Sequence, residues 1–189
     1  MAYSMDLTNN LRVSLKTLYP TDISVSMTCV EIGSFEGRGS VLIHETLCKN
    51  EGSKLYCIDP FDDEYVKGNE KMAFWNEACN GQYAKFRKNT ESLQQVVELR
   101  GTSDAMIPTL EPTSVDFVYI DGDHSPEQVY KDSVNMVPKM KKHSIMLFDD
   151  YLWCINGVVT KDGIDKFLEE YKGKYELIFK KYQLAIRIL

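Results

Sequence analysis

The sequence VEIGSFEGRGS (residues 30–40) joins the end of a short apolar run to the beginning of a segment with helical periodicity. Gly33 and Gly37 allow a tight turn and a close approach of the backbone to a ligand, and a helix is predicted to begin at about Arg38 or Gly39. A glycine-rich turn of this kind also occurs as a plain connection between a strand and a helix. Evidence from the remainder of the sequence is therefore needed to show whether this turn binds a nucleotide.

Short apolar runs rich in β-branched and aromatic residues alternate with helical periodicity along most of the chain. Strands are predicted over residues 27–32, 54–59, 96–100, 115–121 and 143–149, and helices over residues 41–48, 71–83, 104–110 and 126–136. This alternation predicts a parallel sheet that is covered by helices on both faces, with right-handed crossovers.

The end of the chain has a different pattern. A predicted helix over residues 162–171 is followed by two apolar runs, 175–180 and 184–189, with only a short polar link between them. Since a parallel connection needs many more residues than this link, the two runs are predicted to form an antiparallel hairpin. The predicted fold class is therefore α/β, a mostly parallel, seven-stranded Rossmann-like sheet with a C-terminal antiparallel hairpin and helices on both faces.

Composition limits the kind of protein. At 189 residues the chain is predicted to form a single domain, residues 1–189, and 28 acidic against 22 basic residues give a net charge of −6. This charge argues against a nucleic acid partner, because phosphate binding depends on clustered Lys and Arg. No apolar run approaches the roughly 20 residues of a membrane span, and the N-terminus lacks the layout of a signal peptide. We therefore expect no membrane partner. The five cysteines include no CxxC pair, so we expect reduced thiols and a cytoplasmic, intracellular location.

In an open α/β sheet, ligands bind beyond the carboxyl ends of the strands. The first predicted strand carries Glu31 just before the glycines, where a carboxylate disfavours a pyrophosphate and favours a cationic amino group or sulfonium. The second ends at Asp59, which is placed to accept hydrogen bonds from a ribose diol, with a helix N-cap as the alternative. The third runs into Ser103 and Asp104, which could contact adenine, although Asp104 could equally be an N-cap.

Four carboxylates follow the fourth and fifth predicted strands: Asp121, Asp123, Asp149 and Asp150. These strands are expected to be neighbours, so the four side chains share one cleft, where unpaired like charges would raise some of their pKa values. A hard divalent cation such as Mg²⁺, Mn²⁺ or Ca²⁺ would remove the conflict, because such ions prefer oxygen ligands. The alternative is that Asp123 and Asp150 only cap turns. His124 is a candidate general base, or else a histidine that faces solvent.

These features resemble class I S-adenosylmethionine-dependent methyltransferases over nearly the whole chain. VEIGSFEGRGS is similar to the first motif of that family, YCID (residues 56–59) to its second-strand acid and RGTSD (residues 100–104) to its adenine-side turn. The resemblance implies a Rossmann-like methyltransferase fold that binds S-adenosylmethionine. The cofactor-binding residues implied are Glu31, Gly33, Ser34 and Gly37 for the methionine part, Asp59 for the ribose, and Thr102, Ser103 and Asp121.

The segments IDGDHS (residues 120–125) and LFDDY (residues 147–151) resemble metal-dependent O-methyltransferases of the sugar-modifying macrocin O-methyltransferase type. That resemblance implies a metal held by Asp121, Asp149 and Asp150, with Asp123 as the catalytic base and His124 as the other candidate. DDYLWCING (residues 149–157) is also similar to a stretch of catechol- and caffeoyl-type enzymes, but Asp150 stands in place of their Asn and no Lys follows Asp121 closely.

These differences favour an O-methyltransferase that modifies a hydroxyl of a sugar, a glycan or a similar vicinal diol, with Trp153 as a wall for the acceptor. A catechol or phenolic acceptor is the alternative. An NAD-binding oxidoreductase and a non-catalytic S-adenosylmethionine-binding module are further alternatives, and Glu31 argues against the first of these. The expected partner is a small-molecule or glycan hydroxyl acceptor, and a homo-oligomer is compatible with the resemblance.

Overall fold

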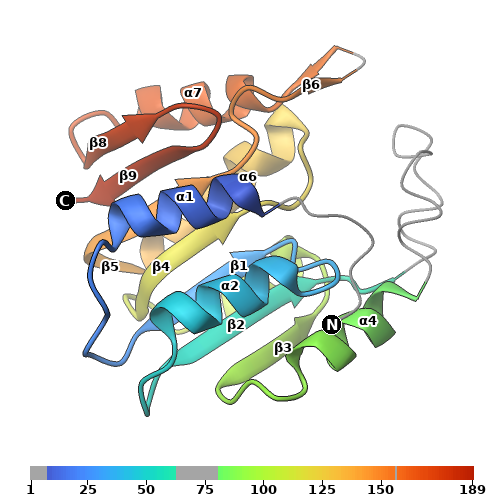
Figure 1. Ribbon diagram of the computed structural model, residues 1–189. Helices are drawn as coiled ribbons and strands as arrows, with labels where there is room; N and C mark the ends of the chain where they lie inside the picture. The colour runs from blue at the N-terminus through green and yellow to red at the C-terminus, as the bar shows by residue number, and fades with distance from the viewer. Residues whose placement is uncertain (1–7, 63–80, 156) are drawn as a thin grey trace.

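A seven-stranded sheet forms the centre of the computed structural model, which describes residues 8–62, 81–155 and 157–189 (Figure 1). The strand order is β3-β2-β1-β4-β5-β9-β8. The first five strands in this order pair in parallel, and β9 pairs antiparallel with both β5 and β8. The strands are β1 (Thr28–Ile32), β2 (Lys54–Asp59), β3 (Val96–Arg100), β4 (Val115–Ile120), β5 (Met140–Phe148), β8 (Tyr175–Lys180) and β9 (Leu184–Ile188).

Helices cover both faces of this sheet (Figure 1). On the front face in Figure 1 lie α1 (Asn9–Leu18), α2 (Arg38–Leu47) and α4 (Gln82–Thr90). The opposite face carries α5 (Ser103–Met106), the 3₁₀ turns η2 (Ile107–Thr109) and η3 (Val137–Lys139), α6 (Pro126–Met136) and α7 (Thr160–Glu170). A small separate hairpin pairs β6 (Cys154–Ile155) with β7 (Val158–Val159).

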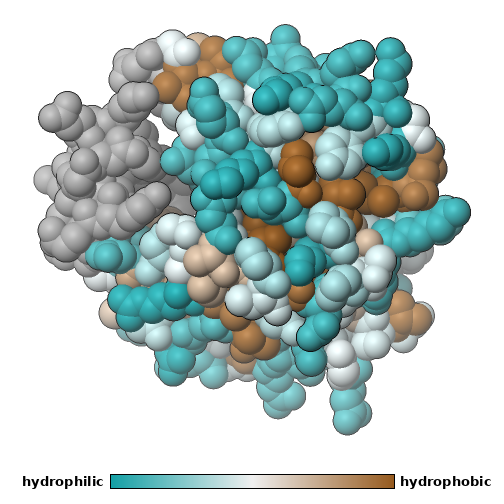
Figure 2. All heavy atoms as spheres, turned by 180° about the vertical axis from the view of Figure 1, so that it is seen from behind, coloured by the Kyte–Doolittle hydropathy of each residue, from teal (hydrophilic) through white to brown (hydrophobic). Residues whose placement is uncertain are grey.

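Each face of the sheet has its own hydrophobic core, because both faces of the central strands are apolar. On the front face, Leu11 of α1, Ile43 of α2 and Phe86 of α4 are fully buried against strand residues of the same face. On the other face, Val129 of α6 and Phe167 of α7 pack against the alternate strand residues. Seen from behind, the surface is mainly hydrophilic, with hydrophobic side chains in limited patches (Figure 2). The apolar stripes of these helices are thus used for the core.

The predicted fold class is confirmed, including the antiparallel C-terminal hairpin. The strands over 54–59, 96–100 and 175–180 have the predicted bounds, whereas the acids at 121 and 149 lie just beyond β4 and β5. The helix predicted over residues 71–83 falls mostly outside the described residues, and α4 begins at Gln82. The sequence pattern does not predict α1. Its helix NNLRVSLKTL buries only Leu11, Ser14 and Leu15, so its apolar face is short.

The parallel ladder continues past the strands at their carboxyl ends. The N–H of Gly33 donates to the carbonyl of Ile58, and the N–H of Asp121 donates to that of Ile32, each at 2.9 Å. The N–H of Asp149 donates likewise to the carbonyl of Ile120 at 3.0 Å. The residues that follow β1, β4 and β5 therefore begin side by side, where the strand order reverses between β1 and β4. Such a switch point is where open α/β sheets bind their ligands.

None of the helices in the described ranges combines the length and the hydropathy that crossing a membrane requires.

Candidate active site

The turn after β1 depends on its glycines. Gly33 has φ +88° and Gly37 has φ +81°, backbone conformations that favour glycine. A Cβ atom on Gly33 would lie 2.1 Å from the backbone oxygen of Asp121, so no side chain fits there. Gly37 differs from the expectation for a ligand contact, because it does not line the cavity at this edge. A Cβ on Gly37 would instead lie 3.0 Å from the Phe86 ring, so this glycine serves the turn and the packing of α4.

Glu31 is a buried carboxyl that lines the cavity beside this turn. The Ser40 hydroxyl donates a hydrogen bond to Glu31 Oε2, and a Cβ on Gly39 would lie 2.2 Å from Glu31 Oε1. Burial is the main cause that raises the pKa of Glu31 from 4.5 to about 7. A cationic group in the cavity would favour the ionised form, because an opposite charge offsets the cost of burying a carboxylate.

Asp59, at the end of β2, fixes the turn after β1 to its neighbour. The backbone N–H groups of Phe35 and Phe61 donate to its two oxygens at 2.9 and 2.7 Å, and Gln82 Nε2 donates at 3.1 Å. The side chain is buried, which raises its pKa, and it lines the cavity. Asp59 therefore shapes the cavity wall in addition to any hydrogen bonds that it accepts from a ligand.

The third strand leads to a polar cluster on the cavity wall. Thr102, Ser103 and Asp104 all line the cavity. Asp104 is not an N-cap: Thr102 holds that position of α5, and Asp104 forms an ion pair with Lys131 at 2.5 Å, which lowers the pKa of its carboxyl.

Two further residues of this wall, Gln128 and Asp132, were missed by sequence reasoning. Gln128 Nε2 donates to Ser103 Oγ at 3.1 Å and to Asp132 Oδ1 at 2.8 Å, and burial raises the pKa of Asp132 to about 6. Their spacing of four residues, on a predicted helix that follows a site acid, was the signal available.

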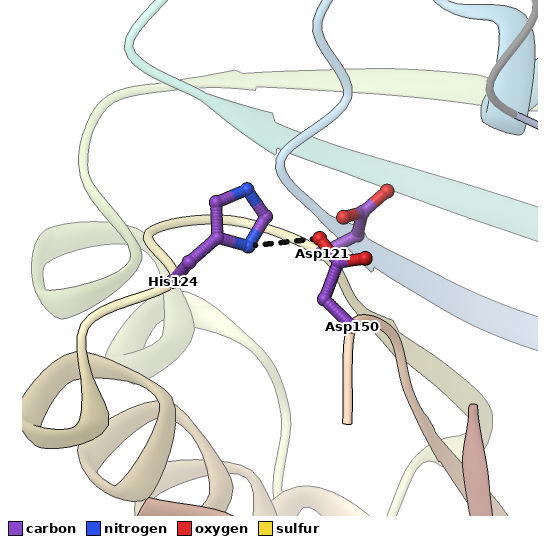
Figure 3. Close-up of side chains that lie close together, drawn as sticks. All are labelled: Asp121, His124 and Asp150. Carbon is purple, nitrogen blue, oxygen red and sulfur yellow. Dashed lines mark ion pairs between the residues drawn. The ribbon is translucent and has the colours of Figure 1, made fainter. Parts of the chain in front are cut away.

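The residues after β4 and β5 form an acidic cluster. Asp121, His124 and Asp150 each offer a ligand atom, and these atoms lie within 4.8 Å of one another. Figure 3 shows the two carboxylates next to each other and the imidazole ring facing them. His124 Nδ1 lies 3.2 Å from Asp150 Oδ2, and both side chains are mostly buried. Burial, followed by the charges of Asp149 and Asp150, raises the pKa of Asp121 well above its usual range.

Asp149 lies beside this cluster but is held by the protein itself. The Tyr119 hydroxyl donates to its Oδ2 at 2.5 Å, and Gln183 Nε2 and the Asp150 N–H donate to its Oδ1 at 2.9 and 2.8 Å. Burial raises the pKa of the Tyr119 phenol, so this group stays a hydrogen-bond donor. Among the described residues, the cluster with ligand spacing contains Asp121, His124 and Asp150 and does not include Asp149. A direct metal contact of Asp149 stays a prediction.

The two candidate bases have different surroundings. Asp123 is exposed, and its Oδ1 accepts a hydrogen bond from the Ser125 N–H at 2.7 Å, as the turn-capping alternative expects. His124 does not simply face solvent, because its ring packs against Trp153 with centroids 4.8 Å apart and is paired with Asp150. Both candidates and Trp153 line the cavity.

One cavity of about 630 Å³ is lined by residues of both the glycine turn and the acidic cluster. Its lining includes Thr8, Asn9 and Asn10 at the beginning of α1 as well as Trp153 and Tyr182. Its size lies within the range of roughly 300–1,000 Å³ that is usual for small-ligand sites. The contributions of α1 and Tyr182 were not predicted from the sequence.

The groups on the cavity wall fit both a cationic ligand and a metal ion. Glu31 and Asp59 are buried carboxyls of raised pKa at the end formed by β1 and β2, where a positively charged ligand would stabilise their ionised forms. Asp121 and Asp150 offer carboxylate oxygens, the ligands that Mg²⁺, Mn²⁺ and Ca²⁺ prefer. The nitrogen of His124 would suit Mn²⁺ better than Mg²⁺.

The fold and the residues at its carboxyl edge define a class I methyltransferase domain. A family model described as a methyltransferase domain, Methyltransf_24, matches residues 30–151. This match covers more than half of the chain, and the chain belongs to that family.

Two curated proteins are similar in sequence. Uncharacterized protein R132 of Acanthamoeba polyphaga mimivirus is 29% identical over 140 residues, which cover 72% of this chain and 57% of that protein. Uncharacterized protein y4gI of Sinorhizobium fredii is 31% identical over 129 residues, which cover 64% of this chain and 13% of that protein. The chain therefore matches only part of the length of either relative.

Solved structures share the fold at low sequence identity. The O-methyltransferase NovP has a TM-score of 0.66 and 19% identity, with 95% of this chain and 78% of that chain covered. An O-methyltransferase from Bacillus cereus, in complex with SAH, has a TM-score of 0.63 and 13% identity, with 98% and 84% covered. These similarities establish the class I methyltransferase fold.

Proposed function

We propose that the protein is an S-adenosylmethionine-dependent O-methyltransferase that uses a divalent cation and modifies a hydroxyl of a sugar, a glycan or a similar vicinal diol. The observation that carries this proposal is the single cavity that joins Glu31 at the glycine turn to the Asp121–His124–Asp150 cluster. A methyl donor at one end and a hydroxyl at the other would share one cavity. Transfer between them needs this proximity.

The end of the cavity at β1 and β2 is suited to the donor. S-Adenosylmethionine supplies an electrophilic methyl group on a sulfonium, and it also carries an amino group. Buried Glu31 would accept a hydrogen bond from the amino group, and Asp59 would accept bonds from the ribose, since each carboxylate oxygen accepts more than one. A dinucleotide is disfavoured because its pyrophosphate would meet Glu31. The SAH complex of the Bacillus cereus O-methyltransferase supports the same class of donor on this fold.

The other end of the cavity is suited to a hydroxyl acceptor. Asp121 and Asp150 would hold a divalent ion, which would bind vicinal oxygens of the acceptor and act as a Lewis acid toward them. Two carboxylates are enough for Mg²⁺, which keeps several of its waters. Asp149 lies next to both and would add negative charge behind the ion, held in place by Tyr119 and Gln183.

His124 is the group that we assign to take the hydroxyl proton. Its Nδ1 lies 3.2 Å from Asp150 Oδ2, so in the tautomer with the proton on Nδ1 this N–H would face the carboxylate and Nε2 would act as the base. The contact with Trp153 holds the ring plane. Asp123, whose Oδ1 already accepts the Ser125 N–H, is the second candidate.

The nature of the acceptor follows from weaker signals. Asp150 stands at the position where catechol-type enzymes have Asn, which favours an aliphatic diol. The aromatic face of Trp153 does not distinguish the two acceptors, because it can stack on sugars and on phenols. A sugar or other aliphatic diol is the acceptor that we propose, and a catechol is the competing outcome. The single domain over residues 1–189, an intracellular location and a homo-oligomer stay predictions.

Labelled donor and a panel of acceptors test this function. The protein is incubated with S-adenosylmethionine labelled at the methyl group and with free sugars, nucleotide sugars, glycans or catechols, in the presence of Mg²⁺ or EDTA. We expect transfer to a sugar-containing acceptor that EDTA abolishes and Mg²⁺ restores. Transfer that EDTA leaves unchanged would contradict the role of a divalent cation. Transfer only to catechols would show that the acceptor is a catechol. NAD binding without binding of S-adenosylmethionine would contradict the whole proposal.

A further inference from the structure

The turn between β8 and β9 lies directly beside the acidic pair that follows β5. Because β9 runs antiparallel to β5, its first residue, Leu184, pairs with the last residue of β5, Phe148. The turn that precedes Leu184 is thus at the same edge of the sheet as Asp149 and Asp150. The N–H of Tyr151 donates to the carbonyl of Tyr182 at 2.8 Å, which ties the two segments together.

Two side chains of this turn reach the acidic pair. The Tyr182 hydroxyl donates to Asp150 Oδ1 at 2.6 Å, and Gln183 Nε2 donates to Asp149 Oδ1 at 2.9 Å. Gln183 is buried, whereas Tyr182 lines the cavity and is 37% exposed. Each of the two consecutive acids is therefore bonded by one of two consecutive residues of the C-terminal hairpin.

The bond from Tyr182 leaves the other oxygen of Asp150 facing the cluster. Oδ1 accepts from Tyr182, while Oδ2 faces His124, near Asp121. Without the phenolic hydroxyl, the carboxylate could rotate about its last bond and exchange the two oxygens. Hydrogen bonds of this type to a ligating carboxylate commonly fix its orientation, and their loss costs about 10- to 100-fold in metal affinity or activity.

We propose that Tyr182 and Gln183 are positioning residues of the acceptor site, through which the C-terminal hairpin sets the orientation of Asp150 and Asp149 for a divalent cation. This inference rests on the metal site of the proposed function. Neither a sequence motif nor the residue types of Tyr182 and Gln183 indicates that the C-terminal strands take part in this site.

The test measures binding of Mn²⁺ alone to the chain of residues 1–189, by the loss of the electron paramagnetic resonance signal of free Mn²⁺. Tyr182→Phe removes only the hydroxyl, and Tyr130→Phe is the matched control. Tyr130 also donates to a carboxylate, Glu170 at 2.5 Å, but on the exposed side of α6 and α7. We expect a Kd for Mn²⁺ about tenfold or more higher in Tyr182→Phe, a smaller rise in Gln183→Leu, and a value within about twofold of the wild type in Tyr130→Phe.

SAH affinity, measured by calorimetry on the same proteins, separates positioning from a general loss of structure. We expect it to be unchanged in Tyr182→Phe. Wild-type Mn²⁺ affinity in Tyr182→Phe, or a parallel loss of Mn²⁺ and SAH affinity, would overturn the inference and leave the proposed function standing. A wild-type chain that binds no Mn²⁺ would overturn both. Weakened Mn²⁺ binding in Tyr182→Phe without methyl transfer by the wild type would support the inference and contradict only the proposed reaction.

Discussion

The two ends of the cavity handle negative charge in different ways. At the donor end, Glu31 and Asp59 lie on separate strands, and each has its own hydrogen-bond donors from the protein. At the acceptor end, Asp121, Asp149 and Asp150 share one small space, and each of the first two has its pKa raised by the charge of a neighbouring carboxylate in addition to burial. In the proposed function, a cationic donor would offset the buried carboxyls of the donor end, and a divalent cation would offset the closer carboxylates of the acceptor end.

The hydrogen bonds at the acceptor end only partly compensate for the negative charge of its carboxylates. Tyr119 and Gln183 bind Asp149, and Tyr182 binds Asp150. All of these donors are neutral, so they orient the carboxylates without cancelling the charge. Burial and mutual repulsion therefore favour the neutral forms of these carboxyls unless a cation binds them.

The largest effect is expected from Asp121→Asn, which removes one charge from the acceptor end and keeps the shape of the side chain. Turnover should fall by about 10⁴-fold, since metal assistance is worth several kcal/mol. Mg²⁺ should no longer stimulate the remaining activity of the variant, and the affinity of the variant for SAH should stay within a few-fold of the wild-type value. Steady-state kinetics and calorimetry measure the two quantities.

Thermal unfolding of the metal-free protein sharpens this prediction. Because burial and repulsion raise the pKa of Asp121, its neutral replacement should raise the unfolding temperature. Asp22→Asn, at an exposed position before β1, is the control and should leave both turnover and unfolding unchanged. Full turnover in Asp121→Asn would show that the two ends of the cavity do not differ in the way described.

A smaller effect is expected from His124→Asn, which tests the assignment of the base at the acceptor end. General base catalysis contributes about 10²–10⁴-fold, so kcat should fall by at least about 10²-fold, with the KM values of both substrates little changed. Asp123→Asn, the neighbouring exposed acid, should lower kcat by much less. If the order of the two losses is reversed, Asp123 is the base and His124 only orients Asp150.

Much of the donor end could be predicted from the sequence, because its groups lie at the ends of predicted strands. Glu31, Gly33 and Asp59 occur at the ends of two strands whose apolar runs are unmistakable, and strand ends define the edge at which ligands bind. The acidic residues after β4 and β5 could be placed for the same reason.

The contacts between distant segments could not be predicted in this way. Tyr182 and Gln183 reach the acidic pair only because β9 pairs with β5 in one particular register, and an apolar pattern does not specify register across 34 residues of chain. The ion pair between Asp104 and Lys131 likewise depends on the packing of α5 against α6. Local sequence thus gives the positions of the acids, while their partners depend on tertiary packing.

The smallest effect on the reaction is expected from Glu31→Gln at the donor end, and it depends on pH. The pKa of Glu31 in the folded, donor-free protein is about 7, above its value of 4.5 in an unfolded chain. The stability that this group contributes is therefore fully present below pH 4.5 and is lost as the pH rises through 7. The loss amounts to about 3 kcal/mol in the free energy of unfolding, at about 1.4 kcal/mol for each unit of pKa difference.

Glutamine does not titrate, so urea unfolding at pH 5 and pH 8 should show that Glu31→Gln gains stability relative to the wild type as the pH rises. Donor binding should respond in the opposite sense. A cationic donor prefers ionised Glu31, so wild-type affinity for S-adenosylmethionine should increase by about tenfold from pH 6 to pH 8, whereas the variant should show little dependence. Equal pH dependence in the two proteins would mean that Glu31 does not face the cationic part of the donor, and that the donor end owes its specificity to its backbone and Asp59.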